Sequence, residues 1–228
     1  MFQQHPRVLV IISLILLCIT IYISFVIGTI PIHFKDILQK LSTGEASNID
    51  TIIDLRLPRI LIALCVGAML SASGALLQAV LQNPLAEAQL LGVSSGALVA
   101  RTVLLLLAPQ LFFYIPLLSF VGGMLPFLML FILSVKFKLL PTRMILIGIA
   151  MFAMLTGLLD LFAQNPFLKM PQGFTMKTWN DVKMIVLSAV IGLAMTIILM
   201  SKVNLLALEE KQANNLGFHI TKYRLIVG

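Results

Sequence analysis

The sequence predicts an all-α protein, a polytopic bundle of transmembrane helices. Hydrophobic residues make up 60% of the 228 positions and charged residues only 11%, whereas a water-soluble domain carries roughly 25% charged residues. Several uncharged stretches match the roughly 20 apolar residues that a membrane-spanning helix needs, and proline or glycine separates them. The composition excludes a soluble enzyme, a nucleic-acid-binding domain and a disordered chain, so membrane lipid must surround most of this protein.

The first two helices are predicted from uncharged runs near the N-terminus. Val8–Ile30 contains 23 residues without a charge. Arg7 gives this run a basic start, but its apolar core is too long for a signal peptide and no A-x-A cleavage site follows. We therefore expect a retained first helix. Ile60–Leu81 contains 22 uncharged residues and predicts the second helix.

Small residues recur at every fourth position of the predicted second helix: Ala63, Gly67, Ser71, Ala75 and Ala79. Positions i and i+4 share one face of a helix, so these residues form a smooth stripe. In lipid there is little hydrophobic drive between helices, and small faces let backbones approach closely. The stripe predicts a tight contact with a neighbouring helix in a compact bundle.

Four further helices follow from the remaining apolar runs, of which the last two contain Asp160 and Lys183. Gln89–Val135 is interrupted only by Arg101 and is too long for a single span. Ala108-Pro109-Gln110 breaks this stretch and divides it into a third and a fourth helix. Met144–Gln164 predicts the fifth helix, and Val182–Val203 predicts the sixth.

The C-terminal residues predict the start of a seventh helix. An apolar run begins at Tyr223 and the chain stops at Gly228, so we expect one transmembrane domain over residues 1–228 that is truncated at its C-terminus. With the N-terminus inside, eight Lys and Arg lie inside and seven outside, which does not decide the orientation. The formal net charge of +7 fits basic residues at membrane interfaces, and no nucleic-acid partner is expected.

Two connections between the predicted helices are unusual. Asn83-Pro84 interrupts a helix, and the residues Leu-Gly-Val-Ser-Ser-Gly-Ala at 91–97 allow close approach of the backbone. Irregular polar backbone at membrane depth is either buried in protein or lines a water-filled path. These segments predict either a gate on a substrate path or a tight turn, and the residues alone do not decide between the two.

Arg101 and Asp160 are the ionisable residues that lie deepest in the predicted helices. Each costs a few kcal/mol in lipid unless it is paired or hydrated. They could pair with each other, line a translocation path or reach the membrane surface. Charge exchange between them would suit an ion-coupled secondary transporter, which is the alternative function from a different class.

Residues 204–217 predict a short amphipathic helix on the membrane surface, with leucines near one face and acids and amides on much of the other. Gly217 is a suitable C-terminal stop. The segment is either a connector in the interface or a docking helix for a cytoplasmic partner. The residues proposed for this contact are Leu205, Leu208, Glu209, Glu210, Ala213, Leu216 and Gly217.

No motif for catalysis or for a bound cofactor is found. The chain has no G-x-x-x-x-G-K-[ST] loop for nucleotide phosphates, no H-E-x-x-H and no G-x-S-x-G. Cys18 and Cys65 lie within apolar runs, and the three histidines are far apart, so neither a disulfide framework nor a metal site is indicated. We expect neither an enzyme nor a chain that binds its own cofactor.

A series of motifs extends over some forty residues of the chain, from position 55 to position 97. They are Leu55-Arg56-Leu57-Pro58-Arg59, Gly67-Ala68, Ser73-Gly74-Ala75-Leu76-Leu77-Gln78, Asn83-Pro84-Leu85-Ala86 and Leu91-Gly92-Val93-Ser94-Ser95-Gly96-Ala97. In order and spacing they closely resemble the iron-complex and cobalamin permease family, the membrane subunits of type II ATP-binding-cassette (ABC) importers. The resemblance covers essentially the whole chain, and Ala213 with Leu216-Gly217 resembles the family's coupling helix.

Within the family, the chain is most similar to the haem permeases of Gram-positive surface haem-scavenging systems. Thr29-Ile30, Pro171-Gln172-Gly173 and Met176-Lys177-x-Trp179 favour that branch. The Trp-x-x-Gly-Ser stretch that usually follows the fifth helix is not found. The resemblance therefore implies haem as cargo, with a ferric siderophore as the alternative.

The resemblance also implies roles for particular residues. Arg56 and Arg59 would lie at the outer mouth of the second helix and pair with acidic residues of an extracellular substrate-binding lipoprotein. One cytoplasmic gate would consist of Asn83, Pro84 and Leu85, and its companion of Pro141 and Thr142.

The assembly implied by the resemblance is a homodimer in the cell membrane with cytoplasmic N-termini. Residues 205–217 would insert into a cytoplasmic ABC ATPase, which would bind ATP and Mg²⁺, and its closure would move the gates as rigid bodies. Family members have ten helices, so this chain departs from the family in length. A structural membrane subunit without a path of its own is a further alternative.

Overall fold

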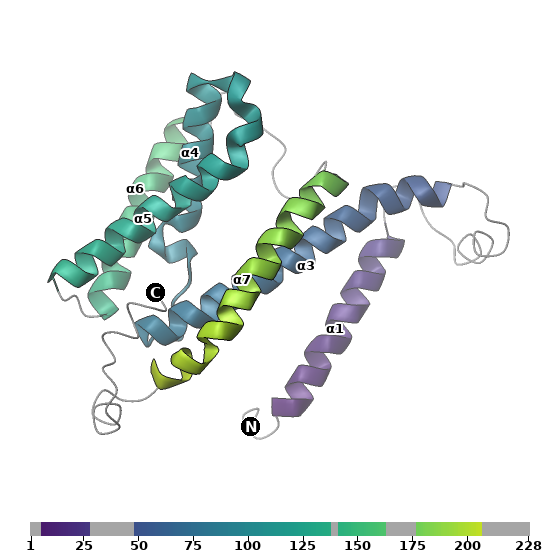
Figure 1. Ribbon diagram of the computed structural model, residues 1–228, viewed down its shortest axis with the longest axis horizontal. Helices are drawn as coiled ribbons and strands as arrows, with labels where there is room; N and C mark the ends of the chain where they lie inside the picture. Colours follow the sequence, from purple (N-terminus) through teal and green to yellow (C-terminus); the bar gives the residue numbers. More distant parts are fainter. Residues whose placement is uncertain (1–5, 28–47, 138–140, 163–176, 207–228) are drawn as a thin grey trace. The chain divides into compact units, whose positions relative to one another are not determined.

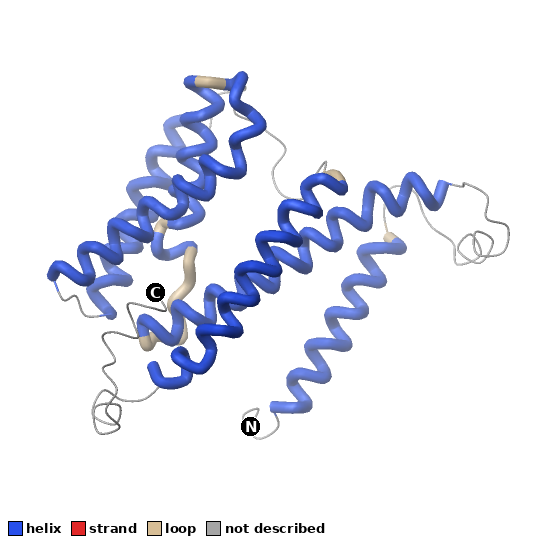
Figure 2. Tube along the Cα trace, in the orientation of Figure 1, coloured by secondary structure: helices blue, strands red, loops and turns tan. Residues whose placement is uncertain are grey.

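Helices account for all the regular structure in the part of the chain that the computed structural model describes, residues 6–27, 48–137, 141–162 and 177–206. Figures 1 and 2 show these helices as ribbon and tube. They are α1 (Pro6–Val26), α3 (Asn48–Leu81), α4 (Val93–Leu107), α5 (Ile115–Phe137), α6 (Pro141–Phe162) and α7 (Trp179–Leu206), with the 3₁₀ helices η2 (Gln89–Leu91) and η3 (Pro109–Tyr114). The prediction of an all-α polytopic fold is confirmed.

In the part of the chain that the structure describes, five stretches are long and apolar enough to cross a membrane, and they involve α1, α3, α5 with η3, α6 and α7. The predicted third helix is present as α4, which has only 15 residues. At a rise of 1.5 Å per residue it extends about 22 Å, less than the roughly 30 Å of the hydrocarbon core. The predicted break at residues 108–110 is confirmed, because α4 ends at Leu107 and η3 begins at Pro109.

The start predicted for the second helix, Ile60, is wrong. Helix α3 begins at Asn48 and continues through Pro58, so Arg56 and Arg59 lie within the helix. The prediction began at Ile60 because the uncharged run starts after Arg59, and a proline lacks the backbone N–H of a helical residue. Here the Pro58 ring is fully buried, and membrane helices tolerate proline where neighbouring groups satisfy the freed carbonyl.

The chain forms two compact units, residues 1–68 with 171–191 and residues 69–170 with 192–228. The first unit contains α1 and the N-terminal parts of α3 and α7. Its buried side chains come from α3 (Pro58 and Ile62) and from α7 (Val182 and Ala189). The side chains buried in this unit are therefore small or branched apolar residues of these two helices.

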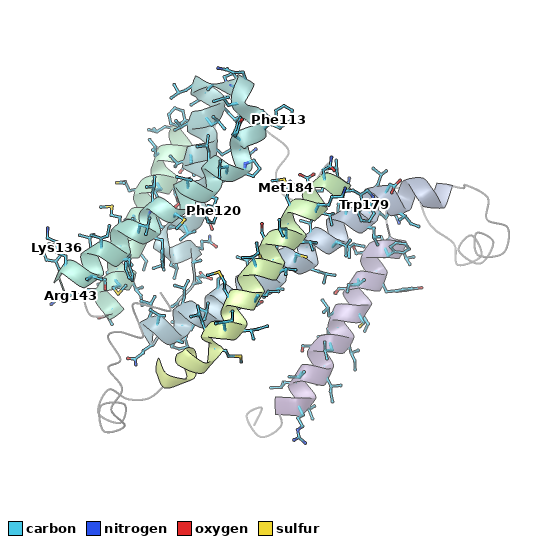
Figure 3. All side chains as sticks on the ribbon, viewed as in Figure 1. Phe113, Phe120, Lys136, Arg143, Trp179 and Met184 are labelled. Carbon is cyan, nitrogen blue, oxygen red and sulfur yellow. The ribbon has the colours of Figure 1, made fainter. Side chains whose placement is uncertain are left out.

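Two polar contacts accompany this packing. Trp179 Nε1 donates to Asp54 Oδ1 at 2.9 Å, which links the start of α7 to α3; Trp179 is labelled in Figure 3. The Asp181 carboxylate accepts hydrogen bonds from the Thr178 backbone N–H at 2.8 Å and the Thr178 hydroxyl at 2.9 Å. An acidic side chain in the first turn satisfies free N–H groups and opposes the positive end of the helix dipole.

The second unit is built on α4, α5 and α6, which pack against one another. The 3₁₀ helix η2 also contacts these helices, most extensively α6. Glycines permit the closest approaches. A methyl group at Gly96 of α4 would lie 2.5 Å from the Gly122 carbonyl oxygen of α5, and one at Gly148 of α6 would lie 2.9 Å from the Leu90 carbonyl oxygen. These glycines replace side-chain packing by direct backbone contact, as small residues do between membrane helices.

Among the described residues, the small-residue stripe of α3 does not form this kind of contact. Ala63, Gly67, Ser71 and Ala75 are exposed, and no atom lies within 4 Å of a methyl group placed at Gly67. The close contacts predicted for the second helix are instead made by the glycines of α4, α5 and α6. Periodicity identified a smooth face, but it did not identify the partner of that face.

Candidate gate and translocation residues

The segment after α3 ends the helix by a defined hydrogen-bond pattern. Gln82 adopts a left-handed conformation with φ of 48°, and the Asn83 N–H donates to the Gln78 carbonyl oxygen at 3.2 Å. A left-handed residue followed by a bond back to the preceding turn is the Schellman ending of a helix. The chain therefore leaves α3 sharply at the site of the predicted gate.

Asn83, Pro84 and Leu85 form a braced turn. The Asn83 side-chain oxygen accepts from the Leu85 N–H at 2.9 Å, and the Ala86 N–H donates to the Asn83 carbonyl oxygen at 3.1 Å. Gln78 Nε2 donates to the Pro84 carbonyl oxygen at 3.1 Å. Asparagine and proline are the residues that favour such a turn, so the tight-turn alternative describes the local structure.

This turn exposes one large apolar side chain. Leu85 is 79% exposed, whereas the next residue, Ala86, is 3% exposed and belongs to the core of the unit. The turn is thus held to the core by Ala86, while the Leu85 side chain remains exposed. A tight turn and a gate are compatible here, since the turn holds the leucine in a fixed position.

The core beneath the turn also holds the start of α6. Leu81, Ala86, Leu91 and Leu130 form a buried cluster, and partly buried residues at the beginning of α6 pack against it. Those residues are Met144, Ile145 and Ile147. The segment 83–85 and the N-terminus of α6 are therefore joined by one hydrophobic core.

Pro141 and Thr142, the companion gate residues, are the first two residues of α6. Proline suits the first position of a helix because its missing N–H would be unpaired there. Thr142 is exposed. The basic residues Lys136 and Arg143 flank this connection at the same end of the unit (Figure 3) and are exposed as well.

The motif at 91–97 serves helix packing. Gly92 has φ of +79° and separates η2 from α4, a conformation that favours glycine. Ser95 is buried, and its hydroxyl donates to the Gly92 carbonyl oxygen at 3.1 Å. The hydroxyl of the buried Ser95 is thus satisfied at the start of α4, and Gly96 provides the contact with α5.

Arg101 and Asp160 do not form an ion pair with each other or with another described residue. Arg101 is half-buried on α4, and Asp160 is exposed near the end of α6. Of the three arrangements left open by the sequence, a structural pair is not found in the described part of the chain.

The two arginines of α3 differ in their surroundings. Arg56 is half-buried and donates to backbone carbonyl oxygens at the end of α1. Arg59 is exposed. Sequence reasoning assigned both arginines the same role. It could not distinguish them, because the carbonyl groups that bind Arg56 lie about 30 residues away along the chain.

A groove with a volume of about 540 Å³ lies in the second unit between the end of α3, α4 and α5. Its walls are mainly apolar, which favours a hydrophobic occupant over a hydrated ion. Sequence reasoning missed it, because its walls come from separate helices. The lining residues are Ser73, Leu76, Leu77, Val80, Ala88, Val93, Ala97, Pro116, Ser119, Phe120, Gly123, Met124 and Phe127.

Most of the predicted ATPase contact lies outside the described residues, as does the predicted start of a seventh helix at Tyr223. Leu205 is part of α7, which ends at Leu206. The other contact residues outside the described part are Leu208, Glu209, Glu210, Ala213, Leu216 and Gly217. No group of three or more metal-ligating side chains occurs among the described residues.

Known proteins similar to this chain are membrane permeases. The model of the FecCD transport family matches residues 16–228. The "Probable heme-iron transport system permease protein IsdF" of Staphylococcus aureus (strain MSSA476) is 53% identical over 228 residues, 100% of this chain and 71% of the relative. The protein of the same name from strain MW2 matches with the same identity and coverage.

A solved structure agrees with these relatives. A protein assigned as a metal-chelate type ABC transporter, in an inward-facing conformation, is 27% identical with a TM-score of 0.71. The match covers 98% of this chain and 71% of that chain. Sequence and fold agree along nearly the whole length, and the chain belongs to the FecCD transport family.

Proposed function

We propose that this chain is the permease subunit of an ABC importer that moves haem across the cell membrane. The observation that carries the proposal is the 53% identity over all 228 residues to a heme-iron transport permease. The apolar helices support a membrane conduit. A ferric siderophore is the alternative cargo. Ion-coupled transport is less favoured, since the chain matches a metal-chelate type ABC transporter over 98% of its length.

The permease would act with three protein partners. A separate cytoplasmic ATPase binds ATP and Mg²⁺ and contacts residues 205–217, an extracellular lipoprotein delivers the cargo, and a second permease copy completes the path. The N-terminus lies in the cytoplasm. No motif for binding nucleotide phosphates occurs in the sequence, which supports an ATPase site on the partner alone.

The braced turn at 83–85 and the start of α6 would form the cytoplasmic gate. Leu85 is presented to solvent by a turn that the core holds from below. Because one core supports both gate segments, a movement of α6 would be passed to the turn as a rigid-body shift. The apolar Leu85 side chain would then close or open the path.

Reconstitution in lipid vesicles tests the importer. With the substrate-binding protein, the ATPase, ATP and Mg²⁺ present, haem is expected to accumulate in the compartment that contains the ATPase. Omission of the ATPase should reduce accumulation to that of empty vesicles. Transport that persists without the ATPase and follows an ion gradient would identify a secondary transporter instead. A ferric siderophore added in competition shows which cargo is preferred.

Replacement of Arg101 by alanine is expected to lower haem uptake by about tenfold, since a hydrogen bond to a charged group contributes about 1.5–3 kcal/mol. Arg101 is half-buried on α4, where its guanidinium could meet a carboxylate of haem. Membrane insertion, measured by immunoblot of the membrane fraction, should be unchanged. Arg7→Ala on exposed α1 is the matched control. Unchanged uptake in Arg101→Ala would remove this residue from the path.

A further inference from the structure

Arg56 connects α3 to the end of α1 within the first unit. Its Nη1 atom donates to the Phe25 carbonyl oxygen at 2.6 Å and lies 3.3 Å from the Val26 carbonyl oxygen. Val26 is the last residue of α1. The guanidinium therefore lies at the C-terminal end of the first transmembrane helix. In Figure 1 this end of α1 approaches α3.

The backbone of α1 needs such a donor at this end. The last carbonyl groups of a helix have no partner within the helix. The Ile27 N–H satisfies the Ile23 carbonyl at 2.8 Å, and Arg56 supplies the donor for Phe25 and Val26. A cation also suits the negative end of the helix dipole, and ionisable residues in membranes often bind backbone carbonyls.

Little else holds α1 in place in the described part of the chain. None of its apolar span is buried. Its half-buried side chains are Ile21, Phe25 and Val26; Phe25 and Val26 lie in the turn that Arg56 reaches, and Ile21 lies one turn earlier. The position of α1 therefore depends on contacts at this one end.

Arg59 lies one turn further along α3 in a different state. Its side chain is exposed, and it has no hydrogen bond or ion pair with another described residue. Its planar guanidinium is free to bind a carboxylate of a partner with two parallel hydrogen bonds. The two arginines thus share a sequence motif but not a chemical environment.

We propose that Arg56 is a positioning residue that caps α1 and holds it against α3, which leaves Arg59 as the one motif arginine that is exposed for the docking that the resemblance implies. The second half of this inference rests on the proposed function, because it takes the substrate-binding lipoprotein as the docking partner. The first half concerns only the arrangement of two helices. The two halves are tested by separate measurements.

The position of α1 is measured with spin labels on the full chain in lipid nanodiscs. Cys18 and Cys65 are replaced by serine, and Tyr22→Cys and Ala63→Cys carry the labels at two exposed positions. Double electron–electron resonance should give a narrow distance distribution in this background. Arg56→Gln is expected to widen it by about twofold or more, since the charged donor is lost. The matched variant Arg59→Gln should leave it unchanged.

A conservative variant keeps this test decisive. Arg56→Lys retains the charge but loses the planar fork of donors, so an intermediate width is expected. If Arg56→Gln does not give monodisperse protein, the lysine variant decides. A distribution as narrow as that of the background, in every Arg56 variant that folds, overturns the capping role whatever the transport activity.

Binding of the substrate-binding lipoprotein is measured on the same nanodiscs. Arg59→Gln is expected to weaken binding by about tenfold or more, since one charge-assisted contact is lost. Arg56→Gln should weaken it by less. Equal weakening in both variants would overturn the division of roles. Binding that neither variant changes would overturn the assignment of Arg59 and the docking part of the proposed function, while the distance measurement still tests the cap.

Discussion

Replacement of Gly122 by alanine is expected to destabilise the second unit by about 1–3 kcal/mol, the usual cost of overpacking a close contact. Gly122 is buried on α5, and an added methyl group would meet the Ala100 side chain and lie 2.8 Å from the Gly96 carbonyl oxygen. Both obstacles belong to α4, so the helices would have to separate. Thermal unfolding of the purified protein in detergent and its monodisperse yield measure the effect.

Gly157→Ala is the matched control for this prediction. Gly157 is also a helical glycine, on α6, and no atom lies within 4 Å of a methyl group placed there. Alanine has the higher helix propensity, by about 1 kcal/mol, so this variant should be at least as stable as the parent. If Gly122→Ala unfolds at the parent's temperature, the close crossing of α4 and α5 is wrong. Equal losses of thermal stability in both variants would show that the effect comes from replacing any helical glycine and not from the contact between α4 and α5.

Asn83→Leu is expected to reduce haem uptake by about tenfold while membrane insertion is kept. The change removes the side-chain oxygen that accepts from the Leu85 N–H. A hydrogen bond contributes about 0.5–1.5 kcal/mol, and leucine lacks the turn preference of asparagine. The turn would then no longer hold Leu85 in one position. Uptake into vesicles, normalised to permease content, is the measurement.

Asn83→Asp distinguishes the turn from the side chain itself. Aspartate keeps an oxygen acceptor for the Leu85 N–H and favours the same turn, so most of the uptake should be retained. A comparable loss in both variants would indicate that the amide group contacts cargo or partner. Full uptake in Asn83→Leu would show that the braced turn has no part in the gate.

Several features of this protein could be predicted from its composition and local order. The uncharged runs located the membrane helices, and Ala108-Pro109-Gln110 correctly separated α4 from α5. The sequence Asn83-Pro84 correctly predicted an interruption after α3. Each of these is a local property, because hydrocarbon selects apolar side chains residue by residue and proline limits its own backbone.

Other features were missed, because they depend on residues far apart in the chain. The second helix was predicted to begin at Ile60, but α3 begins at Asn48 and continues through the buried Pro58. The stripe of α3 was expected to form the tight contact, whereas Gly96, Gly122 and Gly148 form it. The brace from Gln78 to Pro84 has no signal in the sequence pattern.

The sequence by itself determined that this is an all-α membrane protein, where most of its helices lie and which family it resembles. Those properties depend on the length of the apolar runs and on short local motifs. Both can be recognised without knowing which segments are neighbours in the folded protein. The tertiary structure alone decided that Arg56 is engaged by the end of α1 while Arg59 is exposed. Hydrogen bonds and burial depend on which distant segments come together, and spacing along the chain does not specify that.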